Sequence, residues 1–184
     1  MLILLTTSRR PTGGIRTLCR DLANSIPDVV RVNRGKMSLD GIAERAIERE
    51  ADRVVVVDRW RGGSGKINLF QIAPTGLKPV PPLMLIAGVR LRREFKDETR
   101  RVRSSVITME PEDTPELERI AGCLSQFLDL PLLSVDEAAG KFGASMHFSF
   151  DSSRRLQFTF ILLHRMIEIG PRVTLSKLVW EVPK

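Results

Sequence analysis

The chain opens on an apolar run, which is followed by a polar turn and an amphipathic segment. Residues 1–5 are wholly apolar, which is typical of a strand covered on both faces. Residues 6–14 collect Thr, Ser, Arg, Pro and Gly, the residue types of turns. Between Ile15 and Ile26 the apolar side chains recur at helical spacing. The pattern therefore predicts a buried strand, a turn and a helix.

The rest of the first half alternates between short apolar runs and one more amphipathic segment. A helix is expected from Leu39 to about Glu50, with Ser38 as its N-cap. Strands are expected at residues 29–32, 53–58, 67–72 and 83–91. The unbroken valines of residues 54–57 indicate a central, doubly covered strand. Residues 59–66 form a glycine-rich turn, and residues 74–82 are predicted to form a proline-rich loop.

The second half repeats this order of elements. Thr114 and Pro115 begin a helix that continues to about Leu128, and Ser134 with Glu137 forms a capping box that opens a brief helix through about Phe142. Strands are expected at residues 102–109, 131–133, 146–150, 156–163 and 173–182. Both halves are thus predicted to be β-α-β-α-β-β-β.

This repeated order predicts an α/β protein with mixed sheets and helices packed on them. The charged segment 92–101 is the expected boundary, so that the halves span about residues 1–98 and 99–184 of one domain. Halves of this size are marginal alone, and we expect them to share strands or a substantial interface.

Composition narrows the class of protein. An apolar fraction of 42% and a charged fraction of 28% are those of a globular protein, and no run approaches the ~18 apolar residues of a membrane span. The first residues lack the pattern of a signal peptide, so we expect a cytoplasmic protein without a membrane partner. Cys19 and Cys123 lie at apolar positions and are expected to be buried thiols. With only 2 Cys and 2 His, we expect no zinc site.

Positive charge is concentrated in the first half. Residues 1–100 hold 19 Lys and Arg against 11 Asp and Glu, whereas residues 101–184 hold 10 against 11, which accounts for the net charge of +7. A basic half beside a neutral half indicates a face that binds a polyanion. Arg outnumbers Lys by 22 to 7, and arginine suits bidentate phosphate contact. GC-rich codon usage would also raise the arginine content.

Two stretches are candidates for anion contact. The first places four arginines around the start of the first helix: Arg9, Arg10, Arg16 and Arg20. The second is the glycine-rich turn, with Arg59, Arg61 and Lys66. Both follow strands, and if these strands are parallel neighbours the two stretches meet at one edge of the sheet. The alternative is a solvated loop, an ordinary hairpin turn and a helix face in water, as is usual for charge runs.

Other chemistries fit the sequence poorly. The segment 61–66 departs from a P-loop, which needs glycine where Trp60 stands and Ser or Thr where Ile67 stands. His147 and His164 lie in strand-like segments and are expected to be half-buried structural residues. The acidic residues of segment 110–118 suit a helix N-terminus better than a metal site. We therefore expect neither an enzyme nor a cofactor.

Three motifs resemble the Brix-domain family. The run TTSRRPT at residues 6–12, followed by a basic helix, is similar to the family's opening motif. Segment 51–69 resembles its strand, basic RG turn and strand. Residues 168–172, EIGPR, with the strand that follows, resemble its closing motif. The length resembles that of single-domain archaeal members.

This resemblance implies a non-catalytic ribosome-biogenesis protein that binds pre-ribosomal RNA and assists its processing. It also implies that each half resembles the anticodon-binding domain of class IIa aminoacyl-tRNA synthetases. The expected partners are a ribosomal RNA precursor and other ribosome-assembly proteins. Arg172 either contacts RNA or pairs with a carboxylate of the fold, and the sequence does not choose between these roles. The alternative function is a protein–protein scaffold, which would present residues 178–180 to a partner.

Overall fold

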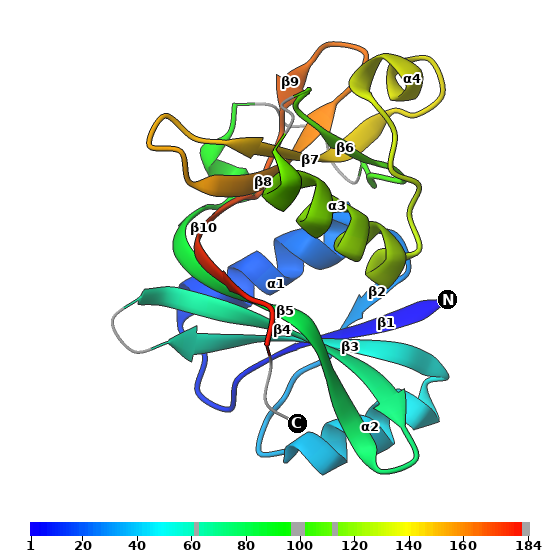
Figure 1. Ribbon diagram of the computed structural model, residues 1–184. Helices are drawn as coiled ribbons and strands as arrows, with labels where there is room; N and C mark the ends of the chain where they lie inside the picture. The colour runs from blue at the N-terminus through cyan, green and yellow to red at the C-terminus, as the bar shows by residue number, and fades with distance from the viewer. Residues whose placement is uncertain (61–62, 97–101, 112–113, 182–184) are drawn as a thin grey trace. The chain divides into compact units, whose positions relative to one another are not determined.

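The computed structural model describes residues 1–60, 63–96, 102–111 and 114–181, and its elements are labelled in Figure 1. The chain forms two compact units, and neither is one continuous segment. Unit 1 consists of Met1–Ala23, Asp28–Ala87 and the segment from Ser176 onward. Unit 2 consists of Asn24–Pro27 and Gly88–Leu175.

Unit 1 is built on a mixed sheet with the strand order β2-β1-β3-β4-β5. Its strands are β1 (Leu2–Thr7), β2 (Val29–Arg31), β3 (Ala51–Trp60), β4 (Gly63–Ala73) and β5 (Gly76–Arg90). Its helices are α1 (Gly13–Ser25) and α2 (Leu39–Glu48). β1 is parallel to both β2 and β3, whereas β4 is antiparallel to β3 and to β5. The last residues of α1 and β5 belong to unit 2.

The core of unit 1 follows the predicted apolar pattern. Leu4 in β1 is 1% exposed, and Val54 and Val56 of β3 are buried beside it. Ile42 and Ala46 of α2 pack against this cluster. The helix begins where predicted, because the hydroxyl of its N-cap residue, Ser38, accepts a hydrogen bond from the backbone N–H of Gly41 at 3.0 Å.

The strands of unit 2 are mostly shorter than those of unit 1, and they too pair in both parallel and antiparallel directions. Its elements are the 3-10 turn η1 (Arg92–Glu94), the strands β6 (Ile107–Met109), β7 (Ala144–Phe150), β8 (Leu156–Leu162), β9 (Ile167–Glu168) and β10 (Arg172–Val179), and the helices α3 (Pro115–Leu128) and α4 (Val135–Ala139). β6 is parallel to β7, β7 is antiparallel to β8, and β8 is antiparallel to β10 and β9. The end of β10, from Ser176, belongs to unit 1.

Aromatic side chains fill the core of unit 2. Phe148 of β7 and Phe160 of β8 are both 0% exposed, and Phe158 lies 5.8 Å from Phe148 between ring centroids. α3 buries one face of its helix, which comprises Leu117, Ile120, Ala121, Leu124, Phe127 and Leu128. The predicted capping box at Ser134 and Glu137 is present and starts α4.

The predicted proline-rich loop is wrong. Residues 76–82 belong to β5, in which Pro79 pairs with Phe70 and Val80 with Leu69. The register then shifts, so that Met84 faces Ile67. Proline donates no hydrogen bond and is accepted in strands at such irregularities, which is why a strand survives a segment that looks like a loop.

Other boundaries also differ from the pattern. The strand predicted at 102–109 is limited to β6, the one at 131–133 is only a bridge between Ile107 and Leu132, and α4 ends at Ala139. The glycine-rich turn is narrower than predicted, since β3 and β4 extend into it. His164 lies exposed in a turn, and Cys123 is half-buried. Apolar residues such as Val106, which is 0% exposed, are buried without being part of a strand. The apolar pattern at 102–109 therefore predicted a strand that is longer than the observed one.

Candidate anion-binding site

The two basic stretches meet at one edge of the unit 1 sheet. β1 and β3 are parallel neighbours, with Leu5 opposite Val55 and Thr7 opposite Val57. The pairing continues past β1, because the backbone N–H of Ser8 donates to the carbonyl oxygen of Val57 at 3.0 Å. Arg9 and Arg10 therefore emerge beside the end of β3, as the sequence predicted for parallel strands.

This edge contains a hollow of about 400 Å³, which we call the basic hollow. Its lining consists of Ser8, Arg9, Arg10, Arg34, Asp58 and Arg59. Four guanidinium groups and one carboxylate give this lining a formal charge of +3. Guanidinium groups donate in planar forks that match carboxylate and phosphate oxygens, so the hollow is suited to an anion.

Arg34 is the cationic lining residue that sequence reasoning missed, and Ser8 and Asp58 were not predicted as contacts either. Arg34 is only 8% exposed, and its Nε donates to the carbonyl oxygen of Met37 at 2.9 Å while its Nη1 donates to that of Thr7 at 3.3 Å. Burial and the charge of Arg9 lower the pKa of Arg34, whereas Asp58 acts in the opposite direction. The available signal was its place in the turn after β2, the other parallel neighbour of β1.

The remaining arginines of the hollow differ in how firmly they are held. Arg9, Arg10 and Arg59 are all exposed. The Nε of Arg9 donates to the carbonyl oxygen of Met37 at 3.2 Å. The carboxylate of Asp58 accepts from the backbone N–H of Arg59 at 2.7 Å, which fixes the backbone of Arg59.

Four of the other predicted contacts lie outside this lining, three of them in unit 1. Arg16 and Arg20 are exposed on α1, and Nη2 of Arg16 donates to the carbonyl oxygen of Pro11 at 3.2 Å. Lys66 of β4 lies opposite Asp58 of β3 in the antiparallel register. Arg61 falls outside the described residues. The start of α1 is capped by Thr12, whose hydroxyl accepts from the backbone N–H of Ile15 at 3.3 Å.

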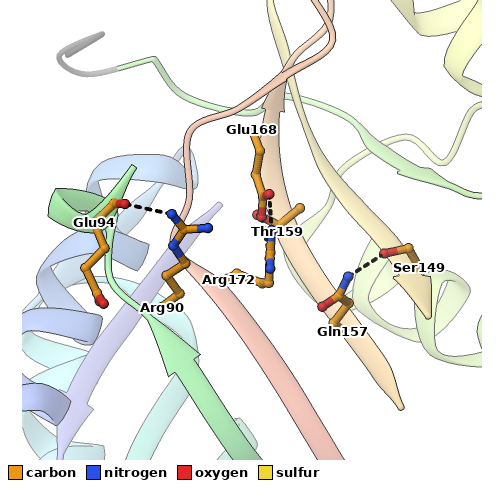
Figure 2. Close-up of polar contacts among 7 residues, drawn as sticks. All are labelled: Arg90, Glu94, Ser149, Gln157, Thr159, Glu168 and Arg172. Carbon is orange, nitrogen blue, oxygen red and sulfur yellow. Dashed lines mark hydrogen bonds and ion pairs between the residues drawn. The ribbon is translucent and has the colours of Figure 1, made fainter. Parts of the chain in front are cut away.

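Arg172 belongs to unit 2, where it pairs with a carboxylate of the fold (Figure 2). Its Nε donates to Oε1 of Glu168 at 2.6 Å, and its Nη2 donates to Oε2. The hydroxyl of Thr159 donates to the same carboxylate at 2.6 Å. Burial would raise the pKa of Glu168, but the hydrogen bonds from Arg172 and Thr159 lower it below the ordinary value. The hydrogen bond to Glu168 raises the pKa of Arg172.

Residues of the EIGPR segment and Arg90 pack against the ring of Phe95. The guanidinium carbon of Arg90 lies 4.3 Å from the centroid of this ring, and that of Arg172 lies 5.8 Å from it. Arg90 is held in turn by the carbonyl oxygen of Glu94, which accepts from its Nη2 at 2.9 Å (Figure 2). Gly170 has φ +65°, and a Cβ there would lie 2.3 Å from the ring. The EIGPR residues thus form a local packing motif of unit 2.

A polar network runs across β6 and β7. The hydroxyl of Thr108 lies 2.9 Å from that of Ser145 and 2.9 Å from Nδ1 of His147. Burial lowers the pKa of His147, and the charge of Glu168 opposes this effect. In the part of the chain that the structure describes, no group of three or more His, Cys, Asp or Glu side chains could hold a metal ion. Nor does any described helix have the length and apolarity needed to cross a membrane.

Curated relatives carry the family name that the motifs indicated. A probable Brix domain-containing ribosomal biogenesis protein of Aeropyrum pernix is 39% identical over 90 residues, which cover 49% of this chain and 50% of that protein. Its counterpart in Pyrococcus horikoshii is 31% identical over 94 residues, which cover 51% of this chain and 42% of that protein. The chain thus spans about half the length of the curated relatives it matches. No family model matches the chain.

Solved structures resemble nearly the whole chain. The crystal structure of a probable ribosomal biogenesis protein from Aeropyrum pernix K1 superposes with a TM-score of 0.74 at 27% identity, over 97% of this chain and 98% of that one. An archaeal Imp4-like protein has a TM-score of 0.65 at 20% identity, over 97% and 99% of the two chains, which is a likeness of fold. The resemblance to archaeal Brix-domain proteins is therefore confirmed, and the mixed α/β fold is Imp4-like.

Proposed function

We propose that this protein is a ribosome-assembly factor that binds pre-ribosomal RNA and assists its processing without catalysing a reaction. The observation that carries the proposal is the basic hollow, in which three separate segments bring four arginines together. RNA offers a dense array of phosphates, and arginine is well suited to contact them. The names of the archaeal relatives support a role in ribosome biogenesis.

RNA contacts extend from the basic hollow in this proposal. Arg16 and Arg20 lie four residues apart on α1 and share one helix face, so they can follow a phosphate backbone from the hollow. Lys66 of β4 would add a contact, and Arg61 remains a predicted one. Arg172 is the weakest of the predicted contacts, because an RNA phosphate would compete with Glu168 for its guanidinium.

The proposed repeat of two halves, about residues 1–98 and 99–184, finds support in the strand pairings. In unit 1 the strand order is β2-β1-β3-β4-β5, with two parallel pairings followed by two antiparallel ones. In unit 2 the Leu132 bridge, β6, β7, β8 and β10 follow the same sequence of directions. We propose that each half is a copy of one ancestral unit that resembles a synthetase anticodon-binding domain.

RNA binding at different salt concentrations tests the proposed function. Fluorescence anisotropy would measure the affinity of the full chain for labelled fragments that tile a pre-ribosomal RNA. The logarithm of the affinity should fall linearly with the logarithm of the salt concentration. A double variant, Arg9→Ala with Arg10→Ala, should flatten that slope by about 1.4 to 1.8, since each phosphate contact contributes about 0.7 to 0.9.

A charge-matched control separates this site from general electrostatics. Arg45 and Arg49 are exposed on or next to α2 and lie outside the hollow's lining, so Arg45→Ala with Arg49→Ala removes the same charge elsewhere. This control should leave the slope nearly unchanged. If both double variants flatten it equally, the hollow is not the RNA site.

The alternative function is a protein–protein scaffold without RNA contact. Its expected surface, Leu178, Val179 and Trp180, is half-buried rather than exposed, so it has less support than the basic hollow. If the chain binds none of the RNA fragments but retains other assembly proteins after nuclease treatment, the scaffold replaces the proposed function. A cytoplasmic location and partnership with other assembly proteins remain predictions.

A further inference from the structure

We propose that the basic hollow is a specific site for a phosphate monoester at an end of an RNA chain, with Arg34 as its fixed donor. This inference rests on the proposed function, because it names the group of the RNA that the hollow receives. A monoester carries up to two charges and three terminal oxygens, whereas an internal phosphodiester carries one charge and two such oxygens.

The first argument is the state of Arg34. A guanidinium has five N–H donors, and the hydrogen bonds to the carbonyl oxygens of Met37 and Thr7 use two of them. The side chain is 8% exposed and lines the hollow, and no described residue partners its remaining donors. An anion in the hollow could accept hydrogen bonds from the remaining N–H groups of this guanidinium. Its backbone partners hold it in place before any ligand arrives, which reduces the ordering cost of binding.

The second argument is the crowding of like charges. Arg9 and Arg34 donate to the same carbonyl oxygen, that of Met37, at 3.2 and 2.9 Å. Arg10 and Arg59 add two more guanidinium groups, and of the described lining residues only Asp58 carries a carboxylate. The formal charge of +3 exceeds what one phosphodiester can neutralise. A dianionic monoester leaves a smaller excess of positive charge, and its oxygens can accept hydrogen bonds from several guanidinium groups at once.

The third argument concerns Ser8 and the size of the hollow. The hydroxyl oxygen of Ser8 is buried without a hydrogen-bond partner among the described residues, and Ser8 lines the hollow. Buried hydroxyl groups are normally paired, and rotation of the Ser8 side chain toward the hollow would let a ligand oxygen pair with it. A volume of about 400 Å³ lies in the range of small-ligand sites, so the hollow has room for a terminal phosphate and its nucleotide.

Binding of RNAs that differ only at their ends tests the inference. Four forms of one single-stranded RNA would be compared by anisotropy at one salt concentration: with a 5′-phosphate, with a 3′-phosphate, with hydroxyl groups at both ends, and circularised. One phosphorylated form should bind at least tenfold more tightly than the dihydroxyl form, and the circular form should match the dihydroxyl form. The 5′ and 3′ arms identify which end is recognised.

Two controls keep this test specific. A dihydroxyl RNA lengthened by two nucleotides carries the added charge internally and should show no tenfold gain. Ser8→Ala and Arg34→Lys should each reduce the preference to threefold or less, while Arg45→Ala should preserve it. Arg34→Lys keeps the charge but loses the fork. Ser8→Ala provides a second variant that leaves the buried guanidinium untouched.

The outcomes separate this inference from the proposed function. If the chain binds all forms of the RNA equally, with a clear salt dependence, the end-specific site is wrong and the proposed function stands. The inference is also overturned if the lengthened dihydroxyl RNA gains as much affinity as the phosphorylated RNA. If no form of any tested RNA binds, the proposed function itself fails.

Discussion

Arg9 and Arg34 share one acceptor, since both donate their Nε–H to the carbonyl oxygen of Met37. This arrangement ties the loop after β1 to the turn after β2 and holds two positive charges side by side. Like charges at such short range repel, and the repulsion is stronger where water is partly excluded. An anion bound in the basic hollow would relieve this repulsion and so stabilise the fold.

Anions should therefore stabilise the wild-type fold. Inorganic pyrophosphate at ten times its dissociation constant should add about 1.4 kcal/mol to the free energy of unfolding. For a chain of 184 residues this raises the midpoint of thermal unfolding by roughly 3 to 6 °C. Calorimetric scans with pyrophosphate, against chloride at equal ionic strength, would measure the shift.

Arg34→Met should abolish that shift because it removes the fixed donor. The variant also leaves the carbonyl oxygens of Thr7 and Met37 without these donors, which should cost about 1–3 kcal/mol without any ligand. Arg45→Ala, which lies outside the hollow's lining, should retain the full response to pyrophosphate. A shift of the same size in the Arg34 variant would show that pyrophosphate binds elsewhere.

The meeting of two basic loops could be predicted from sequence, whereas the burial of Arg34 could not. The carboxyl ends of parallel neighbouring strands meet at one edge, and this rule brings Arg9 and Arg10 close to Arg59 once β1 and β3 are recognised. Arg34 sits in a short polar turn that looks solvated. Its burial is decided by carbonyl oxygens that only the folded backbone brings to it.

The role of the closing motif, EIGPR, could likewise be predicted only in part from the sequence. A carboxylate partner for Arg172 was one of two open interpretations, and the structure identifies that partner as Glu168. The contact of Phe95 with Gly170 links residues far apart in sequence, so no local pattern signals it. The same limit explains β5, whose prolines indicate a loop until the register shift beside β4 is known.

Gly170→Ala should strongly destabilise unit 2. The added methyl group would lie 2.3 Å from the Phe95 ring, and the φ of +65° disfavours a side chain. We expect a loss of about 2–4 kcal/mol in the free energy of unfolding, measured by urea denaturation. Phe95→Leu in the same chain should restore part of it, because the smaller side chain leaves room for the methyl group.

Gly122→Ala is the matched control for that substitution. Gly122 lies within α3 and shows no positive φ, and a methyl group added to it would meet no described heavy atom within 4 Å. Alanine is a better helix former than glycine, so this variant should gain about 0.5–1 kcal/mol. Equal effects of the two alanine variants would contradict the packing role assigned to Gly170.

Glu168→Gln should lower stability at neutral pH and have little effect in acid. The folded-state pKa of Glu168 lies below the ordinary value of 4.5, so its ion pair stabilises the fold above pH 4.5 and is lost as the pH falls further. At pH 7 we expect a deficit of about 1–3 kcal/mol relative to wild type. Urea denaturation at pH 7 and pH 3 would show whether the deficit shrinks on acidification; a constant deficit would contradict the pairing.

His147 should make stability depend on pH in a higher range. Burial lowers its folded-state pKa below 6.5, so the unfolded chain binds a proton more readily, and stability should decline as the pH falls below 6.5. His147→Gln, which keeps a hydrogen-bonding group for Thr108, should remove this decline. His164 is exposed and is the other of the 2 histidines, so His164→Gln should leave the decline intact. Urea denaturation from pH 8 to pH 5.5 would measure the slopes, and the prediction fails if the His164 variant, rather than the His147 variant, loses the decline.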